Sequence, residues 1–187
     1  MTPEDQSLDP EFFLTHQPLT LYRLAREKYA NLSGIGAAVA PGRWNDPGEE
    51  AIYTSTEVSV PVLERLARTP KELIPSNLAL MKIRISGAWK AYNVALQDPK
   101  TMSCLWFYRS LAEAKQDFNA PANVPRWFAG INPFAVAVPS VIVPVWNVVL
   151  YPKGIGFWDH VSLESIEPFQ FDPRLFPENT PVEATEE

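Results

Sequence analysis

The sequence predicts an α+β fold, in a single compact domain with short, mainly antiparallel strands and a few helices. Its 187 residues are enough for one domain with a substantial core. Hydrophobic residues make up 46% of the chain and aromatic residues 12%, so folding can bury enough apolar surface to offset the loss of chain entropy. Nineteen prolines against eight glycines favour short elements and many turns, because proline breaks helices and is confined to strand edges.

Two short strands are expected in the first third of the chain. Residues 19–23 have the apolar and aromatic character of a strand, and residues 51–53 have the same character. Between them, glycines and polar residues from position 31 to about 48 are typical of a loop.

A helix is expected after the second strand, and two positions compete to begin it. Thr54 and Glu57 match a capping box for a helix that includes Leu63. Pro61 would also fit the first turn of a helix that begins at Ser59. The N-cap is therefore either Thr54 or Ser59.

The remaining elements alternate between strands and a helix without a regular βαβ repeat. Apolar residues of one parity at 78–85 predict a half-buried strand, and the spacing of apolar residues at 109–118 predicts a short amphipathic helix. The β-branched runs at 135–138 and 141–143 predict two core strands with a break between them, and 146–151 is a further apolar run. This order favours α+β over a doubly wound sheet.

The two ends differ from the middle in composition. We expect a loosely ordered N-terminal segment at 1–18, the folded domain at 19–176, and an acidic, disordered tail at 177–187. The first residues are acidic and precede no apolar core of a signal peptide, and no run of eighteen apolar residues occurs, so neither secretion nor membrane insertion is expected.

Charge and cysteine content narrow the function classes. The net charge of -6 argues against broad binding to nucleic acid or to an anionic membrane, although a local basic pocket is compatible with it. Cys104 is the only cysteine, which excludes an internal disulfide and favours a reducing, cytoplasmic location.

Common catalytic motifs are missing from the sequence. His16 and His160 lie far apart and without the spacing of metal ligands, so we expect no metal site. The sequence has no Walker loop, no GxGxxG and no G-x-S-x-G elbow, which disfavours kinase, Rossmann and serine-hydrolase chemistry.

Two arginines and a tyrosine are candidate ligands of a phosphorylated nucleoside. Arg43 lies in a glycine-flanked loop, where its guanidinium could bind phosphate, or it could be a surface arginine beside a buried Trp44. Arg23 is a second candidate cation. The ring of Tyr53 could stack on a planar base, or it could belong to the core.

Three polar residues occupy apolar surroundings. Glu64 lies between leucines of the expected helix, where it is either a buried carboxylate with a purpose or a solvated residue. Ser140 and Asn147 interrupt apolar runs, and each either serves a ligand or satisfies a nearby backbone group.

Taken in order, seven short motifs resemble the RES domain family, which is named for its Arg, Glu and Ser. They extend from about residue 19 to 176, and the match is strongest from Gly42 to Glu64. The motifs are Leu21-Tyr22-Arg23, Leu32-Ser33-Gly34-x-Gly36-Ala37, Gly42-Arg43-Trp44-Asn45-x-x-Gly48, Ile52-Tyr53, Leu63-Glu64, Val138-Pro139-Ser140 and Phe171-Asp172-Pro173-Arg174-Leu175.

The resemblance implies an ADP-ribosyltransferase-like fold and chemistry on NAD+. RES proteins act as toxins that degrade NAD+ or transfer ADP-ribose, and an Xre-type antitoxin usually accompanies them. NAD+ is then the substrate, cleaved at its nicotinamide–ribose bond by hydrolysis, phosphorolysis or ADP-ribose transfer, and no prosthetic group is expected. By position, the family's catalytic and NAD+-binding residues are matched by Arg43, Tyr53, Glu64 and Ser140, and further NAD+-binding positions by Arg23 and Asn147.

Two other functions stay open at this stage. The chain could be a catalytically inactive RES-like module that binds a nucleotide or a protein. It could also be a structural interaction protein that uses the aromatic segment at 104–108, and a homo-oligomer is compatible with either.

Overall fold

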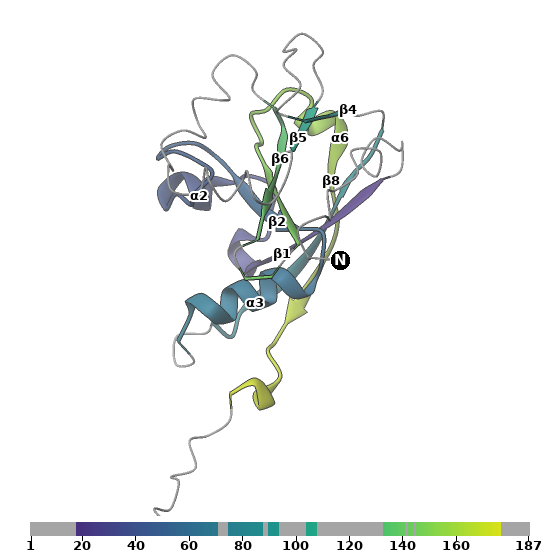
Figure 1. Ribbon diagram of the computed structural model, residues 1–187. Helices are drawn as coiled ribbons and strands as arrows, with labels where there is room; N and C mark the ends of the chain where they lie inside the picture. Colours follow the sequence, from purple (N-terminus) through teal and green to yellow (C-terminus); the bar gives the residue numbers. More distant parts are fainter. Residues whose placement is uncertain are drawn as a thin grey trace, which may run out of the picture.

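The computed structural model describes residues 18–70, 75–87, 90–93, 104–107, 133–140, 142–143 and 145–176 (Figure 1). The expected helix at 109–118 lies outside the described residues, as do the expected N-terminal segment up to residue 17 and the acidic tail at 177–187.

An eight-stranded sheet in the order β4-β5-β6-β7-β2-β1-β3-β8 forms the centre of the described structure. Six of these strands, from β6 to β8 in that order, pair antiparallel, whereas β4 with β5 and β5 with β6 pair parallel. The strands are β1 (Leu19–Arg26), β2 (Ile52–Ser55), β3 (Leu78–Ile85), β4 (Lys90–Asn93), β5 (Cys104–Phe107), β6 (Ala135–Pro139), β7 (Trp146–Leu150) and β8 (Val161–Phe169). The expected α+β class with mainly antiparallel strands is confirmed.

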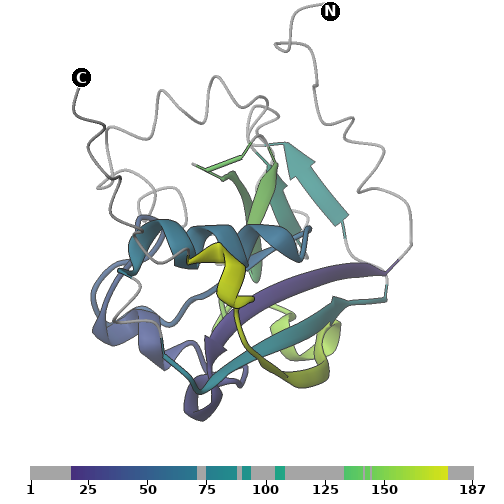
Figure 2. The same ribbon diagram turned by 90° about the horizontal axis from the view of Figure 1, so that it is seen from below.

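The helices are short and lie at the margins of the sheet. The longest described helix is α3 (Ser59–Arg68), which contacts β1 and β2 and crosses below them in Figure 1. In Figure 2, which views the molecule from below, α3 runs past the long strands β1 and β3. The others are α2 (Ile35–Val39), α6 (Phe157–His160) and the 3-10 turns η2 (Glu27–Tyr29) and η4 (Pro173–Leu175).

The core lies along the antiparallel part of the sheet. The alternation expected at 78–85 is confirmed, because β3 has those bounds and its side chains are buried and partly exposed in turn. Its fully buried residues join those of neighbouring strands and of α6 in one apolar cluster, which includes Leu21, Met81, Ile83, Phe134, Val148, Leu150 and Phe157. This cluster fixes the strands that carry the polar residues described below.

Neither Thr54 nor Ser59 is the N-cap, although the expected helix start at Ser59, with Pro61 in the first turn, is confirmed. Thr54 lies within β2, where its buried hydroxyl donates a hydrogen bond to the carbonyl of Val148. The helix begins at Ser59, after Val58 in the N-cap position, and no side chain caps it. A threonine is often found at a helix N-terminus, but here the pairing of β2 with β7 places Thr54 in a strand.

Two further expectations were wrong, and several elements were not expected, among them β4, β5, α6 and β8. The expected loop at 31–48 contains α2, and residues 142–143 are bends in the turn between β6 and β7. Because β6 pairs antiparallel with β7, the chain must reverse there in spite of its β-branched residues. The strand β8, at the edge of the sheet, carries five exposed residues in nine and has no clear apolar alternation.

Candidate functional site

Glu64 lies on the face of α3 that turns toward the sheet. It follows the fully buried Val60 by one helical turn, and residues four positions apart share a face of a helix. Leu63, one position earlier, is exposed instead. The helical phase therefore resolves the choice that the sequence left open, and Glu64 is a half-buried carboxylate.

Ser140 and Asn147 meet at that carboxylate. The Ser140 hydroxyl donates to Oε1 of Glu64 at 2.9 Å, and the Asn147 amide donates to the same oxygen at 2.7 Å. Hydrogen bonds to a charged acceptor are stronger than neutral ones. Both bonds go to Oε1, and no hydrogen bond to Oε2 is found among the described residues.

The position of both donors follows from the β6–β7 hairpin. Asn147 lies in β7 opposite Val138 of β6 and Ser55 of β2. Ser140 comes directly after β6, where its backbone N–H donates to Val145 O at 2.8 Å and its hydroxyl also accepts from the N–H of Ile142 at 3.3 Å. Ser140 thus satisfies a backbone group and holds Glu64 at once.

Arg43 is electrostatically coupled to the same carboxylate. Partial burial, followed by the charge of Arg68, lowers the pKa of Arg43, whereas Glu64 and then Tyr53 raise it. These side chains lie close enough to influence one another. Arg43 and Arg68 therefore place two positive charges beside a single carboxylate.

Tyr53 contacts the Arg43 loop through its hydroxyl. The hydroxyl accepts a hydrogen bond from Trp44 N–H at 3.0 Å and donates one to Oδ1 of Asn45 at 2.9 Å. The ring is half-buried and packs against the core cluster. The ring therefore belongs to the core, which was one of the two alternatives, and the hydroxyl holds the Arg43 loop.

Arg23 is a partly buried cation whose hydrogen-bond partners are neutral. It donates to the carbonyl of Asn31 at 3.0 Å and lies 3.9 Å from the Met81 sulfur. Burial, and then the charge of Arg65, lower its pKa to about 10, so it still carries a full charge at neutral pH. An anion bound here would relieve that unfavourable environment.

Two arginines and one asparagine near the site were not predicted. Arg65 and Arg68 lie on α3, and Arg65 is coupled to Arg23 and Arg26 as well as to Arg68. The sequence could have indicated them, because they follow Glu64 by one and four positions in the same expected helix. Asn45 is buried and forms hydrogen bonds with several groups of the loop. In the sequence, only its position directly after Trp44 could have indicated it.

Burial of Tyr53 predicts a dependence of stability on alkaline pH. Burial raises the pKa of its hydroxyl to about 12, against the partly opposing hydrogen bond from Trp44. An unfolded tyrosine ionises near pH 10, so the stabilisation is present below about pH 10 and is lost as the pH rises toward 12. From about pH 10 to about pH 12, the free energy of unfolding of the wild type should therefore decrease. This decrease should be about 2 kcal/mol larger than the decrease in Tyr53→Phe.

Urea unfolding at several alkaline pH values measures this difference. Tyr29→Phe serves as the matched control, because Tyr29 is an exposed tyrosine at the end of η2. Parallel pH curves for the wild type and Tyr53→Phe would contradict the burial of the hydroxyl.

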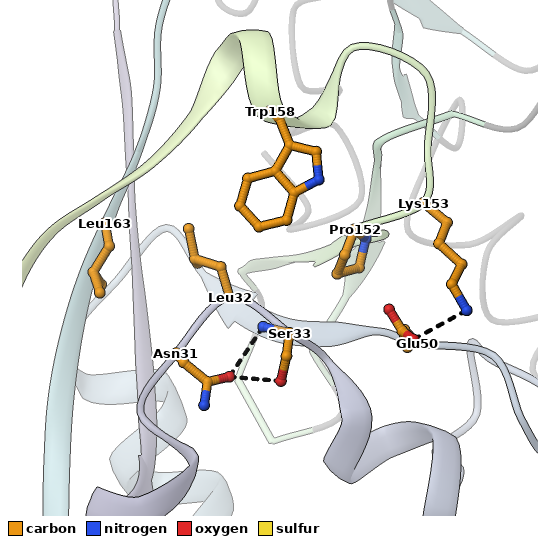
Figure 3. A pocket seen from close by; sticks show the side chains of 8 residues that line it. All are labelled: Asn31, Leu32, Ser33, Glu50, Pro152, Lys153, Trp158 and Leu163. Carbon is orange, nitrogen blue, oxygen red and sulfur yellow. Dashed lines mark hydrogen bonds and ion pairs between the residues drawn. The ribbon is translucent and has the colours of Figure 1, made fainter.

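A separate hollow of about 570 Å³ opens between the loop after β1 and the segment around α6. Figure 3 shows Trp158 reaching over Leu32, with the ion pair between Glu50 and Lys153 at one side. None of the six expected site residues lines it. Its nearest link to them is Asn31, whose carbonyl accepts the hydrogen bond from Arg23.

Two further findings concern the part of the chain that the structure describes. No helix there is long and apolar enough to cross a membrane. No cluster of three or more His, Cys, Asp or Glu side chains occurs there that could bind a metal ion.

Comparison with known proteins places these features in a family. Residues 20–172 match the RES domain. The chain is 30% identical over 162 residues to a protein named Toxin Res from Yersinia enterocolitica, covering 84% of this chain and 99% of that protein. It is 23% identical over 145 residues to a protein named Prs ADP-ribosylating toxin from a Sphingobium species, covering 78% and 86% of the two chains.

A solved structure shares the fold. It is the crystal structure of the M. tuberculosis MbcT-MbcA toxin-antitoxin complex, with a TM-score of 0.56 and 16% identity over 86% of this chain and 87% of that one. The α+β architecture thus agrees with that of a toxin–antitoxin component. On the match across most of its length, this chain belongs to the RES domain family.

Proposed function

We propose that this chain is a RES-type toxin that cleaves NAD+ at the nicotinamide–ribose bond. The observation that carries the proposal is the Glu64 carboxylate, held through one oxygen by Ser140 and Asn147 and coupled to Arg43. Two neutral donors on one oxygen fix the orientation of this carboxylate. Such a group is suited to stabilise positive charge on a sugar.

The arginines around Glu64 supply the binding of the NAD+ pyrophosphate. Arg23 and Arg43 each have a pKa lowered by burial and by another arginine, so each gains from an anionic partner. Guanidinium groups bind phosphate oxygens in pairs. The charges of five arginines influence one another in this region of an otherwise acidic protein, namely Arg23, Arg26, Arg43, Arg65 and Arg68.

The chemistry then centres on C1′ of the nicotinamide ribose. The bond between C1′ and the pyridinium nitrogen breaks, and its electron pair leaves with neutral nicotinamide. C1′ gains oxocarbenium character, which the Glu64 carboxylate stabilises, while Oε2 can accept a hydrogen bond from a ribose hydroxyl. Water, phosphate or a protein side chain captures the sugar.

The resemblance to known toxins supports a partner as well. Relatives are named as toxins, and the structure with the same fold is a complex of a toxin with an antitoxin. We therefore propose that an antitoxin, of the Xre type that accompanies RES proteins, neutralises this chain in the cytoplasm.

Incubation of the purified protein with NAD+ tests the activity. We expect release of nicotinamide, and chromatography of the second product separates ADP-ribose from its phosphorylated form and from a modified protein. The reaction is run with and without phosphate and with cell extract as a source of acceptor proteins. Binding of NAD+ without nicotinamide release under all three conditions would identify an inactive binding module instead.

A further inference from the structure

Asn45 organises the loop that carries Arg43. Its side chain is buried, at 5% exposure, and all of its hydrogen-bonding capacity is used. Oδ1 accepts from Gly42 N–H at 2.9 Å and from the Tyr53 hydroxyl at 2.9 Å. The amide donates to three backbone carbonyls at 2.9, 3.2 and 3.0 Å, those of Ala37, Asp46 and Glu49.

These bonds fix the backbone on both sides of Arg43. Gly42 N–H is bound by Asn45, and Trp44 N–H is bound by the Tyr53 hydroxyl. The carbonyl of Trp44 also accepts from the Tyr151 hydroxyl at 2.5 Å. Arg43 thus stands between two residues whose backbone groups are tied to side chains of the loop and of the sheet.

The same bonds connect the loop to one of the strands that α3 contacts. Tyr53 belongs to β2, and α3, which carries Glu64, contacts that strand. Two hydrogen bonds therefore lead from the backbone beside Arg43 through Asn45 to Tyr53, which is part of the sheet. The position of the guanidinium relative to the carboxylate depends on these bonds.

We infer that Asn45 is a positioning residue, which acts on NAD+ through Arg43 by holding the Arg43 loop against Tyr53. The inference rests on the proposed function, because it takes NAD+ as the ligand of Arg43. Asn45 itself need not contact the substrate. A buried side chain with every polar group satisfied is well suited to hold a loop in one conformation.

Asn45→Asp separates this role from a merely structural one. The substitution keeps the size of the side chain and the acceptor for Gly42 and Tyr53, but it turns an oxygen toward the three carbonyls that the amide had bound. The affinity for NAD+ is measured by calorimetry in the Glu64→Gln chain, which prevents turnover. We expect Asn45→Asp to raise the Kd about 10- to 100-fold, as expected for a small misplacement of a binding group.

The decisive measurement repeats Asn45→Asp on an Arg43→Ala background. If Asn45 acts through Arg43, adding Asn45→Asp to a chain that already carries Arg43→Ala should change the Kd by less than about twofold. The reason is that the effects of coupled residues are not additive. Asn77→Asp is the matched control, since Asn77 is exposed and lies before β3, and it should leave Kd unchanged. Tyr53→Phe cuts the same link from the other side and should show the same dependence on Arg43 if Asn45→Asp fails to fold.

The outcomes separate the two proposals. Equal losses with and without Arg43 would overturn the positioning role alone. Absence of NAD+ binding when Arg43 is present would refute both the positioning role and the proposed function. Nicotinamide release by the wild type, measured in parallel, tests the proposed function independently of these Kd comparisons.

Discussion

Glu64→Gln should lower the rate of nicotinamide release by a factor of about 100 or more, because it removes the charge that stabilises the oxocarbenium ion. Glutamine keeps an oxygen in place of Oε1, so the bonds from Ser140 and Asn147 can persist and the fold should be retained. Initial rates with saturating NAD+ measure the loss in kcat. Circular dichroism and urea unfolding check the fold.

The matched control is Glu27→Gln, which makes the same chemical change at an exposed position of η2. We expect its rate to equal that of the wild type. Wild-type turnover by Glu64→Gln would remove the carboxylate from the mechanism.

Gly42→Ala is expected to destabilise the fold by about 1–3 kcal/mol, the usual range for overpacking, and to impair NAD+ cleavage as well. A Cβ at Gly42 would overlap the hydroxyl and the ring of Tyr53. That ring cannot move aside freely, because its hydroxyl is bound to Trp44 and Asn45. Relief of the overlap must therefore break these bonds or displace Arg43.

Gly36→Ala provides a control with the opposite expectation. Gly36 lies in α2, and a Cβ there would meet no atom within 4 Å. Alanine favours a helix over glycine by up to about 1 kcal/mol, so the free energy of unfolding should stay the same or rise slightly. If urea unfolding gave the same free energy for both alanine variants, the close approach of Gly42 to Tyr53 would be disproved.

Residues that are ordered by local periodicity were predictable from the sequence. The alternation in β3 follows from burial of one face, and the strand bounds agree with it. The turn at 142–143 could not be predicted in this way, because its β-branched residues favour a strand and only the pairing of β6 with β7 reverses the chain. The edge strand β8 has too little apolar alternation to be recognised.

The members of the candidate site were singled out by residue type and surroundings and selected by the resemblance, but their contacts were not predictable. Nothing in the sequence indicates that Ser140 and Asn147 donate to one oxygen of Glu64, since that depends on helical phase and on strand pairing. The roles of Arg23 and Tyr53 as substrate ligands stay predictions. Asn45 was overlooked because a buried asparagine and a loop asparagine look alike in a sequence.

The long separation of the site residues along the chain has a consequence for the timing of activity. Ser140 and Asn147 stand 76 and 83 residues after Glu64, and the contact forms through the pairing of β7 with β2. Contacts that close such long loops form slowly compared with local ones. During synthesis Glu64 therefore leaves the ribosome well before its two donors, so the proposed site cannot assemble in a growing chain until β7 has been made and has paired with β2.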